Sequence, residues 1–569
     1  MQFDWSYFFS LFSLPDFWKA CVTVIELSTL TWLIGMVLGF FLACAKLSGS
    51  RWLRAPTALY IWFFRSVPLL VLVVFVYNLP QLFPASGVLL SNPFISGLLA
   101  LVLTEAAYMA EIHRGGLISV AKGQKEAGRA LAMGGIGIQR LIVIPQAFRI
   151  SLPTLINEYV TVVKLTSLVS VISLTELLQV GERLYAQNFL VMETLSAVAI
   201  YYVLIVTLFG WGLQYLEHRL DLNARKPDTL AAEALDSLRK NLPATPVASR
   251  EVAPAGAPPA LKLKGIRKSY GTHEVLKGVD LSVGNGEVVS IIGPSGSGKT
   301  SLIRTVNGLE SIDGGATELF GKPYIEAGKP DPARLREGVQ HIGMVFQNFN
   351  LFPHRTILDN VTLAPRFHGL AGRDICEQKA LALLDKVGLL THANKYPHQL
   401  SGGQRQRVNI ARNLAVEAEV VLADEPTSML DVSIRIGILN LMEQMKNELG
   451  ISMLYITHDI ATARYVAEDL AVMYVGHMVE WGEVDEILHH PQHPYTQLLI
   501  SAVPDPEKSI HAELEGGRKG EIPLWTPESR GCPFAGRCHQ AMPRCKESLP
   551  PVTRLADNHF VRCYLHEQG

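Results

Sequence analysis

A glycine-rich segment near the middle of the chain has the composition of a loop that holds phosphate. It follows the apolar run VVSII, and its residues are Gly293, Pro294, Ser295, Gly296, Ser297, Gly298, Lys299 and Thr300, after which Ser301 continues into a helical stretch. Glycines let the backbone curl around a polyphosphate, so that its N–H groups and the start of a helix point at anionic oxygens. The spacing predicts that Lys299 reaches the β- and γ-phosphates and that Thr300 holds Mg²⁺.

A second apolar run, Val420–Ala423, ends in the carboxylates of Asp424 and Glu425. In phosphoryl transfer, one such carboxylate steadies Mg²⁺ and a second group orients the attacking water. We therefore assign Asp424 to Mg²⁺ and Glu425 to the water in line with the γ-phosphate. A strand that ends in two carboxylates is weak evidence by itself, but with Lys299 it indicates hydrolysis of a nucleoside triphosphate.

The composition indicates that part of the chain lies in lipid. Charged residues are 18% of the 569 residues and hydrophobic residues are 49%, whereas soluble domains average about 25% charged residues. The 51 Lys and Arg against 52 Asp and Glu give a net charge of −1. Nucleic acid is therefore not predicted as a partner, because binding it relies on a basic surface.

Five apolar runs in the first part of the chain are long enough to cross a bilayer as helices. We predict spans at 27–45, 57–79, 94–110, 152–174 and 195–215. Lys and Arg gather in the segments after the first, third and fifth spans, and the positive-inside rule places those segments in the cytoplasm. This predicts a multi-pass protein of the inner membrane, with a periplasmic N-terminus and everything after Leu220 in the cytoplasm.

The chain divides into four predicted segments. Residues 1–222 form an all-α transmembrane domain, 223–260 form an Ala- and Pro-rich linker, 261–504 form an α/β domain with the phosphate loop, and 505–569 form a small Cys-rich extension. The alternation of short Val/Ile-rich runs with helical stretches supports the α/β prediction for the third segment.

Further motifs in the α/β segment resemble those of the ATP-binding-cassette (ABC) transporter family. The motif Leu400–Gln404 reads LSGGQ, and the other family motifs follow the family's order: Tyr270, Gln347 in VFQNFNLFPH, Asp431 in SMLD and His458 in YITHD. The resemblance implies that adenine stacks on Tyr270, and that Gln347 and His458 serve hydrolysis beside Glu425, with Gln347 also near Mg²⁺. It also implies that Ser401 and Gly403 contact ATP held by a second chain, so that a homodimer is the working unit. Core packing remains the alternative for Tyr270, and an ordinary position at a strand end remains the alternative for His458.

The loop after the third span resembles the EAA loop of binding-protein-dependent importers. It reads GQKEAGRALAMG over 123–134 and is followed by Ile144–Ala147. Together with the segments 64–70, 108–111 and 164–168, it resembles the polar amino-acid permease branch. The resemblance implies a short coupling helix seated beside Gln347 and a periplasmic solute-binding protein as partner. The alternative is a basic amphipathic loop without a docking role.

Glu105 lies in the middle of the third predicted span. Ionisable groups cost at least about 2.5 kcal/mol near the centre of a bilayer, so they usually face a partner or an aqueous path. We predict that Glu105 faces the substrate path and favours a cationic group, as in arginine-, histidine- or opine-like solutes. A role in helix packing is the alternative.

Four of the seven cysteines lie in the last segment: Cys532, Cys538, Cys545 and Cys563. The cytoplasm is reducing, so metal ligation is favoured over disulfides. The surrounding sequence, with His493 before it, resembles the C-terminal extension of oligopeptide and dipeptide transporter ATPases, some of which bind a [4Fe–4S] cluster. Four thiolates suit such a cluster or Zn²⁺, and the absence of a metal is the third possibility.

The sequence thus predicts an ATP- and Mg²⁺-dependent importer of polar amino acids or related small solutes, in which permease and ATPase are fused. The permease motifs favour amino acids, because the substrate passes through that part of the chain, whereas the extension favours di- or oligopeptides. Two alternatives of other classes are an exporter, which usually has six spans and lacks an EAA-type loop, and a regulatory membrane ATPase that moves no solute.

Overall fold

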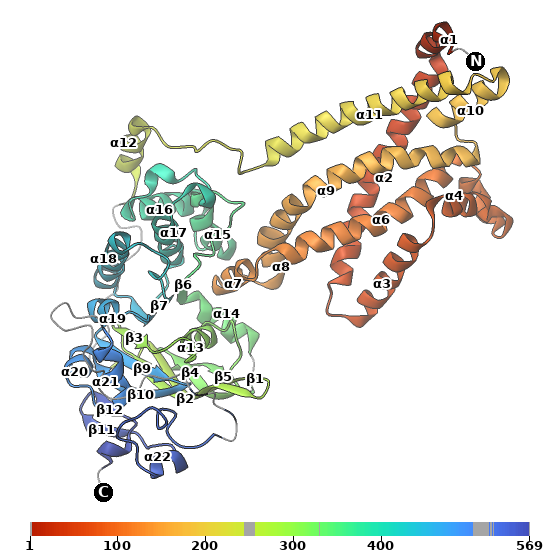
Figure 1. The fold of residues 1–569 in the computed structure, drawn as a ribbon. Helices are drawn as coiled ribbons and strands as arrows, with labels where there is room; N and C mark the ends of the chain where they lie inside the picture. The colour runs from red at the N-terminus through yellow and green to blue at the C-terminus, as the bar shows by residue number, and fades with distance from the viewer. Residues whose placement is uncertain are drawn as a thin grey trace. The chain divides into compact units, whose positions relative to one another are not determined.

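The computed structural model describes residues 3–243, 256–328, 331–503, 523, 526 and 529–567. The chain forms two compact units. The first combines Met1–Ala121 with Gln139–Arg225, and the second combines Lys122–Ile138 with Lys226–Gly569. Figure 1 shows that the first unit is helical and that the second contains sheets and helices.

The first unit is built from helices. The α-helices are α1 (Trp5–Ser10), α2 (Pro15–Lys46), α3 (Arg51–Ser66), α4 (Leu69–Asn78), α5 (Gly87–Leu90), α6 (Pro93–Ser119), α9 (Ile144–Leu165), α10 (Leu177–Asn188) and α11 (Val191–Leu220). Among the described residues, four helical stretches are long and apolar enough to cross a membrane, and a fifth span results if the bent pair α3 and α4 counts as one. The predicted all-α membrane region of about five spans is therefore confirmed.

Two of the predicted spans differ from straight helices. The span predicted at 57–79 is bent by 104° between α3 and α4. Val67 and Pro68 are both extended, and α4 begins at Leu69. Proline disfavours helical geometry at the preceding residue, so α3 ends before Val67. The span predicted at 152–174 leaves α-helical geometry after Leu165 and continues as a 3₁₀ helix over Thr166–Ile172.

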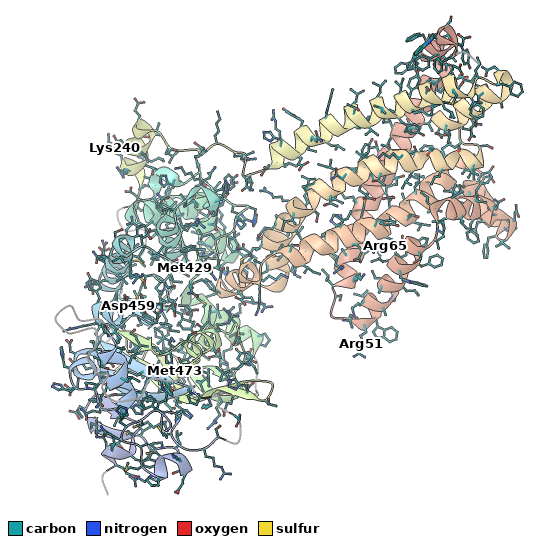
Figure 2. The ribbon with its side chains drawn as sticks, viewed as in Figure 1. Arg51, Arg65, Lys240, Met429, Asp459 and Met473 are labelled. Carbon is teal, nitrogen blue, oxygen red and sulfur yellow. The ribbon has the colours of Figure 1, made fainter. Side chains whose placement is uncertain are left out.

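Small residues allow α2 and α6 to pack closely. A Cβ atom added to Gly39 would lie 2.8 Å from Cβ of Met109 and 3.0 Å from the backbone nitrogen of Ala110. Gly35 lies one turn earlier on α2 and also faces Met109. This small-xxx-small spacing is common where membrane helices meet. Elsewhere on α6, the Tyr108 ring lies under the guanidinium of Arg65 of α3, which is labelled in Figure 2, at 5.2 Å from the ring centroid.

The second unit contains two sheets. One sheet has the order β2-β1-β4-β5 and is antiparallel; its strands are β1 (Leu261–Tyr270), β2 (His273–Val283), β4 (Gly314–Leu319) and β5 (Lys322–Glu326). The other has the order β11-β12-β10-β9-β3-β8-β7-β6. Its strands are β3 (Val288–Ile292), β6 (Ile342–Val345), β7 (Val420–Asp424), β8 (Ser452–Ile456), β9 (Asp469–Tyr474), β10 (His477–Glu483), β11 (Thr553–Ala556) and β12 (His559–Val561).

The larger sheet is parallel from β6 to β9 and antiparallel from β9 to β11. The helices of this unit are α7 (Lys122–Ala130), α8 (Gly135–Ile138), α12 (Ala232–Asn241), α13 (Lys299–Val306), α14 (Pro332–Gln340), α15 (Ile357–His368), α16 (Arg373–Lys386), α17 (Gly402–Leu414), α18 (Val432–Leu449), α19 (Ile460–Val466), α20 (Val484–His489), α21 (Pro494–Ser501) and α22 (Arg544–Glu547). The predicted α/β ATPase fold is confirmed.

The segments predicted as linker and extension have more structure than their compositions suggested. α12 lies within the predicted linker, and Leu230 before it packs against the core of the second unit. In the extension, β12 pairs with β10 and thereby continues the main sheet. The boundaries 1–222, 223–260, 261–504 and 505–569 stay predictions.

Candidate functional site

The phosphate loop joins the fully buried strand β3 to helix α13. Gly293 and Gly298 both have positive φ, at 152° and 101°. A Cβ atom on Gly293 would overlap the carbonyl oxygen of Met473, which is labelled in Figure 2, and one on Gly298 would lie 2.9 Å from Leu276. Side chains are therefore excluded at both ends of the loop, while Ser295 and Gly296 between them are exposed.

Lys299 and Thr300 begin α13 and occupy different surroundings. The Lys299 ammonium donates to the carbonyl oxygens of Gly293 at 2.7 Å and Pro294 at 2.9 Å. Burial lowers its pKa, while the carboxylates of Glu425 and Asp424 act in the opposite direction. The hydroxyl of Thr300 donates to Asp424 Oδ1 at 3.2 Å. Thr300 and Asp424, two of the three residues predicted to hold Mg²⁺, are thus adjacent, and their role as Mg²⁺ ligands stays a prediction.

Asp424 ends β7 and is buried, and this burial raises the pKa of its carboxyl group. The hydroxyl of Thr300, Arg304 and Lys299 counteract that rise. A bound cation at this carboxylate would act in the same direction, because opposite charge favours the ionised form. The surroundings of Asp424 therefore suit a Mg²⁺ ligand.

The three residues predicted to serve hydrolysis come together at the carboxyl ends of neighbouring parallel strands. Gln347 follows β6, Glu425 follows β7 and His458 follows β8. Gln347 Nε2 donates to Glu425 Oε2 at 3.3 Å, and His458 Nδ1 lies 3.3 Å from the same oxygen. Gln347 also donates to Ser428 Oγ at 3.1 Å. Glu425 is held at φ 43°, a conformation that side chains rarely adopt and that often occurs at functional sites.

Tyr270 ends β1 and is 47% exposed as a residue. Its hydroxyl donates to Glu310, and the ammonium of Lys268 lies 5.5 Å from the ring centroid. Ser301, in the first turn of α13, also interacts with the Tyr270 hydroxyl. Tyr270 is thus not part of the buried core, and its role in stacking adenine stays a prediction.

Ser401 and Gly403 lie at the start of α17. The Ser401 side chain caps the helix by accepting from the Gln404 backbone N–H at 3.4 Å, and Gln404 in turn accepts from the Ser401 N–H at 3.0 Å. Ser401 is exposed, whereas Gly403 is buried against Ile434. Their assignment to a partner chain's nucleotide stays a prediction.

Helix α7 of the EAA-like loop docks within the second unit. Gln124 Nε2 donates to the Leu351 carbonyl oxygen at 2.9 Å, and Asn350 lies against Gly123. His368 of α15 donates from Nε2 to the carbonyl oxygen of Leu131, just after α7, at 2.7 Å. The loop thus contacts the segment that begins at Gln347, as the resemblance implied, and α7 and α15 are neighbours in Figure 1.

An arginine that the sequence reasoning did not single out anchors this loop. Arg304 of α13 donates to both carboxylate oxygens of Glu126, at 2.6 and 3.1 Å. This pair lowers the pKa of Glu126 and raises that of Arg304. A sequence signal existed, because Glu126 is the acidic residue of the loop motif and Arg304 shares a short helix with Lys299.

Glu105 lies on α6 in the first unit and is 1% exposed. Within the described part of the chain, its Oε2 has no hydrogen-bond partner. The carboxyl group of Glu158 on α9 lies close enough to interact with it. The predicted contact between Glu105 and a solute therefore stays a prediction, although an unpaired buried carboxyl oxygen is available for one.

The four cysteines of the extension line one cavity, together with His493 and Phe534. Burial raises the pKa of Cys532 to about 12 and that of Cys563 to about 11. In the described residues, no three His, Cys, Asp or Glu side chains are arranged as metal ligands. The structure therefore adds no support to the predicted iron–sulfur cluster or to zinc.

Three protein-family models match the chain in sequence order. "Binding-protein-dependent transport system inner membrane component" matches residues 35–222, "ABC transporter" matches 276–428, and "Oligopeptide/dipeptide transporter, C-terminal region" matches 479–545. These matches cover the helical region, the phosphate-loop region and the first part of the cysteine cluster. They support an ABC importer with a fused permease, and they do not extend to the polar amino-acid branch.

Similar proteins include the oligopeptide transport ATP-binding protein OppF of Salmonella typhimurium, which is 36% identical over 301 residues, covering 51% of this chain and 88% of that protein. AppF of Bacillus subtilis, with the same description, is 36% identical over 305 residues, covering 53% of this chain and 92% of that protein. A solved structure, the dimeric post-hydrolysis state of the ATP-binding cassette MJ0796 bound to ADP and Pi, is 35% identical with a TM-score of 0.37 and covers 39% of this chain and 98% of that one.

The site geometry and the matches lead to the same family. The matched cassette contains the phosphate loop and the carboxylates at the end of β7, and ATP hydrolysis coupled to transport follows from it. The matched permease contains the apolar helices, so the protein is a membrane protein. The chain belongs to the ABC transporter family, as an ATP-driven importer that joins a binding-protein-dependent permease and an ATP-binding cassette in one polypeptide.

Proposed function

We propose that this importer takes up di- and oligopeptides. The main support for this substrate class is the match of residues 479–545 to the oligopeptide/dipeptide transporter C-terminal region. Relatives described as oligopeptide transport ATP-binding proteins support it further. This favours the peptide alternative over polar amino acids, the class that the permease motifs suggested.

The working unit in this proposal is a homodimer in the inner membrane, with the N-terminus in the periplasm and the cassettes in the cytoplasm. Ser401 and Gly403 of one chain close on ATP held by the phosphate loop of the other. Glu425 orients the attacking water, with Gln347 and His458 on its Oε2. The exposure of Ser401 and the joint placement of these three residues support this arrangement.

Closure of the cassettes is transmitted to the permease through α7. Its Glu126 is held by Arg304, and Arg304 lies on the helix that begins with Lys299. A short chain of contacts therefore joins the phosphate site to the loop. A periplasmic solute-binding protein delivers the substrate, and hydrolysis resets the cycle, as in other conformationally gated machines.

Polar amino acids are the second candidate substrate class. Glu105 favours it, because a buried carboxyl group with an unpaired oxygen would attract an ammonium or guanidinium group. Peptides also carry an α-ammonium group, so Glu105 does not by itself separate the two classes.

The deciding experiment is uptake into proteoliposomes loaded with ATP, with a panel of candidate binding proteins. Labelled di- and tripeptides, arginine and glutamine are offered separately, and vesicles that contain the Glu425→Gln variant serve as the control. Peptide accumulation above this control supports the proposal. Accumulation of amino acids without peptides supports the second candidate, and hydrolysis without accumulation of any solute supports a regulatory ATPase.

For the cysteine cluster, we propose a metal site formed by Cys532, Cys538, Cys545 and Cys563. Four thiols that line one cavity suit zinc or an iron–sulfur cluster once they are deprotonated. Metal analysis and visible absorption of anaerobically purified protein separate these two, with a variant carrying Cys376→Ser, outside the cluster, as the control. Protein without bound metal in both measurements would refute the site.

A further inference from the structure

Arg304 is shared between two carboxylates in the second unit. It binds Glu126 of α7 through both Nη atoms, and its Nε donates to Glu310 Oε1 at 2.6 Å. The three side chains are only 18%, 11% and 19% exposed. A planar guanidinium can hold two carboxylates at once with well-defined geometry. If one of these two carboxylates moves, the guanidinium of Arg304 moves with it, and its hydrogen bonds to the other carboxylate change.

Glu310 links this pair to the predicted adenine platform. Its Oε2 accepts a hydrogen bond from the Tyr270 hydroxyl, while its Oε1 accepts from Arg304. Burial and the nearby Glu310 raise the pKa of Tyr270. The phenol therefore stays protonated near neutral pH and can remain the donor. Four residues from three parts of the chain thus form one continuous path of hydrogen bonds.

The path has one adjustable end. Tyr270 is 47% exposed, whereas the other side chains of the path are mostly buried. A purine base stacked on this ring would restrict its orientation and hence the direction of its hydroxyl. Inorganic triphosphate would occupy the phosphate loop without touching the ring. The nucleobase and the phosphates of ATP therefore act on the loop that contains α7 through different residues.

We propose that Glu310 couples the nucleobase site to the docking of α7, through the path Tyr270–Glu310–Arg304–Glu126. The proposal rests on the proposed stacking of adenine on Tyr270. A stacked base stabilises the arrangement in which Glu310 holds Arg304 toward Glu126, and α7 is then held more firmly. Because such coupling is reciprocal, docked α7 also raises the affinity for the base-bearing nucleotide. Glu310 acts as a positioning residue in this scheme and touches no reacting atom.

The test measures hydrogen–deuterium exchange of the α7 backbone, Lys122–Ala130, in the full chain in nanodiscs. All samples carry Glu425→Gln to prevent turnover, and the probes are ATP and inorganic triphosphate. ATP is expected to slow exchange in α7 by at least about fivefold, the lower end of typical allosteric coupling, and triphosphate by much less. Glu310→Gln and Tyr270→Phe are each expected to abolish this difference, and the double variant to add nothing further.

The controls separate coupling from folding and from the proposed function. Glu318→Gln removes a half-buried carboxylate that is paired with Lys264 on the small sheet and lies outside the path, so it should leave the difference unchanged. Glu310→Asp should restore part of it. Equal slowing by ATP and triphosphate, or a normal difference in Glu310→Gln, would overturn the proposal, as would equal loss in the Glu318→Gln control. The readout requires no transported solute, so failure of the peptide proposal in the uptake experiment is a separate result.

Discussion

Glu425 is the residue on which hydrolysis is expected to depend most directly. Its Oε2 is contacted by Gln347 and His458. Asp424, the residue before it, accepts a hydrogen bond from Thr300 at the end of the phosphate loop. A positioned general base typically contributes about 10²–10⁴-fold. We expect Glu425→Gln to lower ATP hydrolysis at least about 100-fold while ATP still binds.

Hydrolysis and binding of a fluorescent ATP analogue measure these two effects separately. Glu443→Gln, an exposed change on α18, is the matched control and should alter neither. Near-normal hydrolysis by Glu425→Gln would exclude Glu425 as the base.

His477 of β10 is a residue-scale source of acid sensitivity. Burial lowers its pKa to about 3, with further lowering by Lys277, Arg562 and Arg267. In the unfolded chain its pKa lies near 6.5, so the unfolded state binds more protons between these values. The second unit is therefore expected to lose stability as the pH falls from about 6.5 toward 3.

Chemical denaturation of the protein and of His477→Gln across that pH range tests this expectation. The variant should show a smaller loss of stability on acidification than the unchanged protein, whatever its stability at neutral pH. Parallel pH profiles for the two proteins would contradict the assignment to His477.

At the scale of elements, the packing of α2 on α6 depends on glycine. A Cβ on Gly39 would already be 2.8 Å from Met109, and overpacking typically costs about 1–3 kcal/mol. We expect Gly39→Leu to lower the stability of the membrane region by that amount. Gly210→Leu on α11 is the matched control, because no atom lies within 4 Å of a Cβ there. Unfolding in detergent measures the difference, and equal stabilities would contradict this packing argument.

The C-terminal extension is a second element, and we expect it to affect the phosphate loop although it does not form part of that loop. Arg537 donates to the Tyr474 hydroxyl at 3.3 Å, and Phe534 packs edge-on against the Tyr474 ring. Tyr474 ends β9, and two residues later the Gly476 N–H donates to Ser297 of the phosphate loop at 3.0 Å. The extension therefore supports the loop through the turn between β9 and β10.

We expect Arg537→Ala to weaken ATP binding about threefold, which corresponds to part of one hydrogen bond. Binding of a fluorescent ATP analogue measures this change. Arg554→Ala, which removes another extension arginine paired with Asp557, should have no effect. Unchanged affinity in Arg537→Ala would show that the turn is held without the extension.

At the scale of the whole molecule, the proposed homodimer predicts complementation between two inactive variants. Ser401→Arg blocks the partner's nucleotide site, and Lys299→Ala disables the chain's own site. A mixed dimer retains one intact site, formed by the Lys299 of one chain and the Ser401 of the other. Each variant alone should be inactive, and random reassociation should restore about a quarter of the wild-type sites.

Hydrolysis after co-reconstitution measures this recovery, and each variant mixed with itself is the control. Full hydrolysis by Ser401→Arg alone, or by a protein that stays monomeric in sedimentation, would contradict the shared site.

The phosphate loop, the carboxylates of Asp424 and Glu425 at the end of β7, and the motif residues Gln347 and His458 could be located from sequence, and their roles stay predictions. Each belongs to a short contiguous motif, and the order of parallel strands brings the ends of these motifs together. Apolar length likewise predicted the membrane region, because the bilayer sets the number of residues that a spanning helix needs. The substrate class was predicted less well: the permease motifs suggested amino acids, whereas the family comparison favours peptides.

Other features depended on contacts between distant segments. The bend at Pro68, the pairing of β12 with β10, and the hydrogen bonds that join Tyr270, Glu310, Arg304 and Glu126 are visible only in three dimensions. The local chemistry follows from the residues alone, because backbone curvature and side-chain type are local properties. The tertiary structure alone decided which charges meet, because an ion pair depends on the separation of its atoms in space and not along the chain.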